Sequence, residues 1–351
     1  MAARRNWLDW CRVICLYLVI LGHTGLHETF LNTYLSNFRM PLFFLLSGYN
    51  RKRDLTLGAH FRRDLRTLLL PYAGFWLILY PHWLLAVAPR HPDLYALNGL
   101  GDAVLKPILG LLVGMGQNTT YSYAISAPLW FLVALFAERS LYNLFVWLLG
   151  GSPRRMLPVA AMLPIVAIAL HSRGVDLPFS LGSALIAFPL YFTGILVRQG
   201  RFEPLARILR SRPELFAVVF FGLLFPIARL NGQVDLAMSV LGNSPFLFYP
   251  AALLGCLGMV ELGLSLNKVT HPALVFLSKG SLVVMSLHLA FIALGKVVFT
   301  PFLIPDRQSD GVVASIELSV FAVLCCLPAV VVVRRFAPWL TGKWRRSAST
   351  A

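Results

Sequence analysis

The stretch LDWCRVICLYLVILGHT, residues 8–24, is apolar enough for a membrane helix, yet it contains Asp9, Arg12 and His23. Apolar runs recur along the chain, and a run of about 20 residues is long enough for a helix to cross the bilayer core. Of the 351 residues, 58% are hydrophobic and 13% are charged, whereas about 25% are charged in a typical soluble domain. Mean hydropathy is +0.71. Since lipid cannot satisfy an open backbone, these features predict an all-α polytopic membrane protein.

The apolar runs predict about ten transmembrane helices. They lie at residues 7–26, 37–50, 67–88, 128–149, 156–170, 180–197, 214–230, 246–264, 281–302 and 312–333. The segment 102–116 is also apolar, but it is short and rich in glycine, so we expect it to be interfacial or re-entrant on the outer side. One membrane domain is expected over residues 1–351, with a core at about 5–340 and a disordered tail at 346–351.

The distribution of basic residues predicts the topology. With the N-terminus inside, 22 lysines and arginines fall in the predicted inner loops and termini, and 5 fall in the outer ones. This bias is the positive-inside pattern, and it places both termini in the cytosol. It also accounts for the net charge of +16 through topology and contact with anionic headgroups, so no nucleic-acid partner is expected.

The five cysteines lie in apolar segments and form no CxxC pair, so neither a disulfide framework nor a metal site is expected. The N-terminus begins with basic residues but has no small-residue cleavage site, and we expect residues 7–26 to be a retained span. No internal repeat is visible. Because inverted repeats are frequent in secondary transporters, their absence from the sequence disfavours transport.

Ionisable residues inside spans are candidate functional residues. Arg12 and His23 are eleven residues apart, so on a helix they lie within about 20° of one face and ~16 Å apart along the axis. Asp9 precedes Arg12 by three residues and can pair with it. Two interpretations follow from the residues alone: a functional pair, or a terminal anchor at Arg12 and a packing histidine at His23.

Three arginines, Arg62, Arg63 and Arg66, precede the third predicted span. The last two are spaced i, i+3 and the outer two i, i+4, so their guanidinium groups gather at the predicted inner membrane face. Such groups suit the phosphates of a cytosolic cofactor, although a plain positive-inside loop has the same composition. No glycine-rich phosphate loop occurs between residues 49 and 66.

Two positions farther along the chain are also candidates. Trp130 lies near the predicted outer interface, where tryptophan commonly anchors a helix. His288 lies about two turns into the ninth predicted span, where a lone histidine is either a packing hydrogen-bonder or a functional group.

In order and spacing, these motifs resemble those of the acyltransferase-3 family of integral membrane O-acyltransferases, in particular its fucose-4-O-acetylase-like and exopolysaccharide acetyltransferase branch. The matching motifs are Arg12 with His23, MPLFFLLSG at 40–48, Arg63 and Arg66 followed by Pro71-Tyr72, LWFL at 129–132, and Ser281 to His288. The resemblance covers about residues 5–340. One departure is Arg39, because histidine often precedes MPLFF in this branch. Arginine keeps a fixed positive charge but loses acid–base function, so we assign Arg39 no catalytic role.

The resemblance implies an O-acetyltransferase of the bacterial cytoplasmic (inner) membrane. The donor would be cytosolic acetyl-CoA, and the acceptor a sugar hydroxyl of an extracytoplasmic or lipid-linked polysaccharide. The expected partners are therefore an acyl-CoA, a sugar or polysaccharide, and membrane lipids. The sequence leaves open the particular sugar and whether the acyl group is acetyl or succinyl. A transporter or flippase of glycan intermediates is the alternative.

The implied chemistry assigns a role to each candidate. His23 is expected to be the base, Arg12 to orient the donor or stabilise negative charge, and His288 to be a second acid–base or orienting group. The coenzyme A phosphates are expected to bind Arg62, Arg63 and Arg66. The sugar is expected to contact Trp130, Tyr121 and Tyr123, with anchoring in the aromatic belt as the alternative. Direct transfer and a covalent acyl-histidine both remain open.

Overall fold

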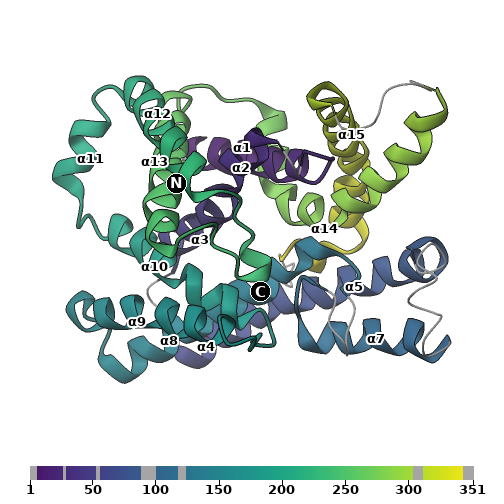
Figure 1. Cartoon of the computed structure of the whole chain (residues 1–351), viewed down its shortest axis with the longest axis horizontal. Helices are drawn as coiled ribbons and strands as arrows, with labels where there is room; N and C mark the ends of the chain where they lie inside the picture. The colour runs from purple at the N-terminus through teal and green to yellow at the C-terminus, as the bar shows by residue number, and fades with distance from the viewer. Residues whose placement is uncertain are drawn as a thin grey trace, which may run out of the picture. The chain divides into compact units, whose positions relative to one another are not determined.

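The computed structural model of the chain describes residues 6–26, 29–52, 56–87, 100–117, 124–302 and 311–342, with the backbone alone at 86–87, 100–103 and 299–302. Within these ranges the chain is helical (Figure 1), and its one extended pairing is an isolated bridge between Asp235 and Val240. The predicted all-α class is therefore confirmed for the described part of the chain.

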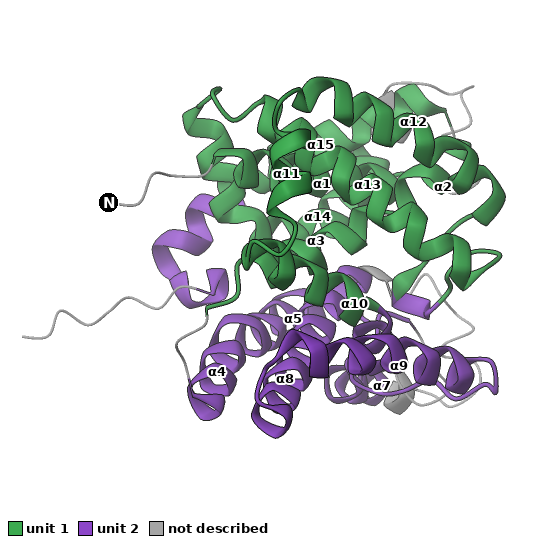
Figure 2. Ribbon diagram, turned by 90° about the vertical axis from the view of Figure 1, so that its left-hand side faces the viewer, with its two compact units in different colours: residues 1–53, 187–236, 240–328 green, residues 54–186, 237–239, 329–351 purple. Residues whose placement is uncertain are grey.

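The chain forms two compact units, each built from segments that are far apart in the sequence (Figure 2). Unit 1 comprises residues 1–53, 187–236 and 240–328, and unit 2 comprises residues 54–186, 237–239 and 329–351. The division passes through two helices, α10 (Leu181–Arg198) and α15 (Val312–Phe336). A single domain over the whole chain stays a prediction.

The remaining helices each belong to one unit. Unit 1 contains α1 (Asn6–Gly22), α2 (Phe30–Ser36), α3 (Arg39–Tyr49), α11 (Glu203–Leu209), α12 (Pro213–Asn231), α13 (Pro245–Ser265) and α14 (Pro272–Phe302). Unit 2 contains α4 (Leu57–Asp64), the π-helical η1 (Leu65–Leu69), α5 (Leu70–His82), the π-helical η2 (Trp83–Val87), α7 (Leu100–Val113), α8 (Trp130–Leu149) and α9 (Pro153–His171).

Eight helical stretches among the described residues are long and apolar enough to cross a membrane. They are residues 57–85, 127–149, 153–171, 181–198, 213–231, 245–265, 272–298 and 312–336, and they correspond to the third to tenth predicted spans. The first two predicted spans correspond to α1, with 17 residues, and α3, with 11 residues. The total of about ten crossings and their orientation stay predictions.

Two helical stretches begin nine or more residues before the predicted spans to which they correspond. The third span was expected to begin at residue 67, but α4 begins at Leu57, where the side chain of Thr56 accepts from the N–H of Ala59 at 3.3 Å and caps the helix. The ninth was expected at 281, but α14 begins at Pro272, a residue suited to the first helical turn because it has no N–H to satisfy. His288 therefore lies near the middle of its helix instead of two turns from its start.

Unit 1 is held together by helices that approach closely at glycines. α1 packs against α3, α13 and α14. A Cβ added to Gly48 of α3 would lie 1.9 Å from the backbone oxygen of Tyr191, and one added to Gly194 would lie 2.0 Å from the backbone oxygen of Leu45. Small residues allow membrane helices to pack backbone to backbone, so α3 and the part of α10 in unit 1 are in direct contact.

In unit 2, α8 packs against α4 and η1. The contact includes an ion pair, in which Nη1 of Arg139 donates to Oδ1 of Asp64 at 3.0 Å. Asp64 is buried, and a buried carboxylate needs such a partner. The arginines of the third span follow one another along α4 and η1, and this contact with α8 fixes the helix that carries them.

Candidate active site

The structure brings together two of the predicted catalytic residues, His23 and His288. His23 directly follows α1, and its backbone N–H donates to the carbonyl of Ile20 at 2.9 Å. His288 lies on α14, which packs against α1 within unit 1. The ring centroids of the two histidines are 5.3 Å apart, and their planes are inclined by 41°. Two imidazoles, the side chains best suited to acid–base chemistry, therefore lie in contact inside a largely apolar unit.

The protonation of His288 follows from its contacts. The side chain is fully buried, and its Nδ1 lies 3.0 Å from the carbonyl oxygen of Val284, one turn earlier in α14. A carbonyl oxygen only accepts, so Nδ1 carries the proton and Nε2 has a free lone pair. No described residue bonds to Nε2. A buried acceptor without a partner is unfavourable, so this nitrogen is suited to bind a hydroxyl group of a substrate.

Arg12 lies on α1, the helix that leads into His23, but not at the histidine pair. The eleven-residue separation corresponds to ~16 Å along the axis of α1, which exceeds the reach of an arginine side chain. Near Arg12, the hydroxyl of Ser278 on α14 donates to the carboxylate of Asp9. This hydrogen bond joins α1 to α14, the two helices that bring the histidines together.

Two groups near the end of α1 were not predicted from the sequence. Nη1 of Arg39, the first residue of α3, donates to Oδ1 of Asn32 on α2 at 2.9 Å. A Cβ added to Gly22 would lie 1.7 Å from the same Nη1, so the guanidinium group rests on the backbone that leads directly into His23. The sequence contained one signal for these groups. Arg39 occupies the position directly before MPLFF, where the branch that the sequence resembles often has histidine.

A loop of unit 1 provides a negative charge for Arg39. Asp235 acts on Arg39 electrostatically. Its backbone forms a two-way bridge with Val240, with both N···O distances 2.9 Å. The neighbouring N–H of Val234 donates to the hydroxyl of Ser36 on α2 at 3.0 Å, so α2 holds the loop that contains Asp235.

The predicted phosphate-binding arginines lie in unit 2. Arg62 and Arg63 are in the last turn of α4, and Arg66 is in η1. Arg62 and Arg66 are exposed, which suits contact with a large anionic molecule. The three remain on one continuous helix, as predicted, but in a different unit from the histidines.

The predicted sugar contacts are only partly described. Trp130 begins α8 in unit 2, and its side chain is 6% exposed. A Cβ added to Gly116 would lie 2.7 Å from Cδ1 of its ring, and the ring meets Phe131 edge-on at 6.2 Å. Stacking of Trp130 on a sugar stays a prediction. Tyr121 and Tyr123 lie outside the described residues.

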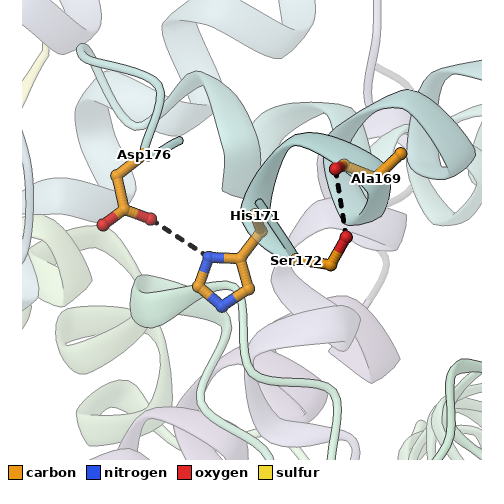
Figure 3. Close-up of polar contacts among 4 residues, drawn as sticks. All are labelled: Ala169, His171, Ser172 and Asp176. Atoms are coloured by element: carbon orange, nitrogen blue, oxygen red, sulfur yellow. Dashed lines mark hydrogen bonds and ion pairs between the residues drawn. The ribbon is translucent and has the colours of Figure 1, made fainter. Parts of the chain in front are cut away.

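One histidine outside this pair, His171, has a carboxylate partner (Figure 3). Nδ1 of His171, the last residue of α9, lies 3.0 Å from Oδ1 of Asp176, and next to it the hydroxyl of Ser172 donates to the carbonyl of Ala169. The two ionisable side chains are 39% and 45% exposed. A pair so open to solvent contributes little to stability, and His288, which is fully buried, is better placed to exclude water from a reaction.

Metal coordination has no candidate site in the part of the chain that the structure describes, since no three His, Cys, Asp or Glu residues there are grouped to hold an ion. The helices define a polytopic integral membrane protein, and the histidine pair is its candidate acid–base site. The family model described as acyltransferase domain, acyltransferase 3, matches residues 5–334. The chain belongs to this family, and it is a membrane acyltransferase.

Comparisons with curated proteins and with solved structures gave no match. The family membership therefore rests on the family model, which covers nearly the whole chain. The narrower branch stays a prediction.

Proposed function

We propose that the protein transfers an acyl group, in the simplest case acetyl, from cytosolic acyl-CoA to a hydroxyl of an extracytoplasmic or lipid-linked polysaccharide. The observation that carries the proposal is the contact between His23 and His288 in a chain that belongs to an acyltransferase family. The acetyl donor, the sugar acceptor and the bacterial inner membrane come from the resemblance of the sequence motifs.

The bonds and the proton of the proposed transfer are accounted for by the two substrates and the two histidines. The sugar hydroxyl oxygen attacks the thioester carbonyl carbon, a C–O bond forms, and the C–S bond breaks. His23 takes the hydroxyl proton and passes it to the leaving sulfur, so the products are an O-acyl sugar and the coenzyme A thiol. His288 accepts a hydrogen bond at its free Nε2 from a neighbouring hydroxyl of the sugar and so orients the sugar ring. In a two-step version, His23 first forms an acyl-imidazole, and the hydroxyl then attacks that group.

The other predicted residues bind the two substrates. With the N-terminus inside, the arginines Arg62, Arg63 and Arg66 hold the coenzyme A phosphates at the cytosolic face. Arg12 lies on the cytosolic side of His23 and orients the arm of the donor. The acceptor reaches the histidines from the opposite face, where Trp130, Tyr121 and Tyr123 contact the sugar.

The proposal is tested with membranes from cells that contain or lack the gene. Radiolabelled acetyl-CoA is supplied to the cytosolic face, and the label in the polysaccharide is measured after removal of lipids. Gene-dependent label in the sugar ester is the expected result. If deletion instead removes the polysaccharide while the acyl groups per sugar stay unchanged, the chain is a transporter or flippase and the proposal is wrong.

A further inference from the structure

We propose that Asn32 and Arg39 form the oxyanion site of this acyl-transfer centre. The inference rests on the proposed function and adds two groups that hydrogen-bond the carbonyl oxygen of the acyl group. Attack on a thioester moves negative charge onto that oxygen. Fixed donors aimed at the oxygen stabilise the transition state more than the ground state, and they commonly supply the largest share of catalysis.

Arg39 is the arginine that lies against the residue before His23. Its guanidinium group rests against Gly22, the residue directly before His23, and only a residue without a Cβ leaves room for it there. Arg12 is ~16 Å away along α1, so it cannot supply the positive charge at the same point. The arginine that replaces histidine before MPLFF therefore stands beside the proposed base.

Asn32 contributes a donor that the protein itself leaves unused. Its side chain is fully buried, and its Oδ1 accepts from Nη1 of Arg39 at 2.9 Å. The guanidinium group only donates, so this contact fixes which way the amide is turned. Nδ2 is then the free atom of the amide, and no described residue accepts from it. A buried N–H donor without an acceptor indicates that a ligand supplies the acceptor.

The unused groups at the end of α1 are complementary to the reaction. His288 contacts His23 and has a free acceptor at Nε2, and Asn32, joined to Gly22 through Arg39, has a free donor at Nδ2. A neighbouring hydroxyl of the sugar donates to the first, and the acyl carbonyl oxygen accepts from the second. The free acceptor of His288 and the free donor of Asn32 both gain hydrogen-bond partners only when the sugar and the acyl donor are bound together.

The protein holds these donors in place before substrate arrives. The side chain of Thr29 caps α2 by accepting from the N–H of Asn32 at 3.2 Å. On the other side, the hydroxyl of Ser36 fixes the loop whose Asp235 balances the charge of Arg39. Donors that are held rigidly need no reorganisation during the reaction, which is the condition for effective oxyanion stabilisation.

Asn32→Asp is the sharpest test, because it keeps the shape and the oxygen that accepts from Arg39 but removes the free donor. Transfer is measured with purified protein in lipid nanodiscs, with acetyl-CoA as donor and acceptor membranes from cells that lack the gene. We expect kcat to fall about 100-fold or more, with the KM for acetyl-CoA within about twofold of wild type. The kcat of Arg39→Lys should fall less than that of Arg39→Ala, because lysine keeps the positive charge.

Gly22→Ala provides a test that removes no polar group. The added methyl displaces the end of a flexible side chain, so the fold is kept while the guanidinium group moves, and kcat should fall. Arg229→Ala, at an exposed arginine of α12 in the same unit, is the matched control and should keep wild-type kcat.

Three outcomes separate this inference from the proposed function. Wild-type kcat in both Asn32→Asp and Gly22→Ala overturns the oxyanion site. A rise in the KM for acetyl-CoA at unchanged kcat also overturns it, because the residues then bind the donor equally before and during reaction. If wild-type protein transfers no acyl group, the proposed function fails instead.

Discussion

His23 is partly buried, and it has contacts that a histidine present only for packing does not need. It lies 5.3 Å from the ring of His288 and follows a glycine against which an arginine rests. Replacement by alanine removes the proposed base, and general-base catalysis is typically worth about 10²–10⁴-fold in rate. We therefore expect His23→Ala to lose transfer by that factor, measured as label in the polysaccharide at matched protein level.

The control for His23 is the exposed histidine at the end of α9. His171→Ala removes an imidazole that has a carboxylate partner but is open to solvent, so it should keep wild-type transfer. Near wild-type transfer by His23→Ala would show that another group removes the hydroxyl proton.

The variant Arg66→Ala tests whether this arginine binds the phosphates of the acyl donor. A charge-assisted hydrogen bond to phosphate is worth about 1.5–3 kcal/mol, so its loss should weaken donor binding about 10- to 150-fold. We expect Arg66→Ala to raise the KM for acetyl-CoA by such a factor, measured from initial rates over a range of donor concentration. Arg207→Ala, an exposed arginine of α11, should leave the KM unchanged. Equal donor dependence in the two variants would rule out the phosphate role of Arg66.

At the scale of helices, α3 and α10 are fixed by contact of their backbones. A Cβ at Gly48 would overlap the carbonyl of Tyr191, and a backbone atom cannot move aside as a flexible side chain can. We expect Gly48→Ala to destabilise the protein by about 1–3 kcal/mol, in the range found for overpacked cores. The measurement is the midpoint of thermal unfolding in detergent, followed by tryptophan fluorescence.

Gly222→Ala is the matched control for this contact. Gly222 lies in α12, and no atom lies within 4 Å of an added Cβ. Alanine is favoured over glycine in a helix by about 1 kcal/mol, so this variant should unfold at the wild-type temperature or above it. Equal midpoints for the two variants would contradict the close contact of α3 with α10.

For the molecule as a whole, the charge distribution predicts that the segment after α9 faces outward and the segment after α10 faces the cytosol. Arg173 and Arg201 are exposed residues in these segments. Arg173→Cys should react with a membrane-impermeant maleimide in intact cells, whereas Arg201→Cys should react only after the membrane is opened.

The labelling is measured in protein that also carries Cys325→Ala. Cys325 is partly exposed and could react with the maleimide, whereas the other four cysteines are buried. Labelling of Arg201→Cys alone in intact cells would reverse the predicted orientation. Labelling of both positions from the same side would show that α10 does not cross.

The sequence by itself determined the fold class, because bilayer-length apolar runs with few charges have no stable alternative to helices in lipid. It also identified His23 and His288 as candidates, since each ionisable group within an apolar helix is unfavourable without a purpose. The helix starts at residues 57 and 272 lie before the predicted spans, because they depend on local capping and on a proline at the first turn, outside the apolar runs.

Only the tertiary structure decided which of these groups meet. His23 and His288 are 265 residues apart in the chain, and the packing of α1 against α14 brings their rings into contact. The place of Arg39 depends on a glycine in one helix and an asparagine in another, a combination that no local pattern encodes. Apolar periodicity is a property of each segment, whereas a site depends on side chains from several segments converging, and that convergence is a property of the packed fold.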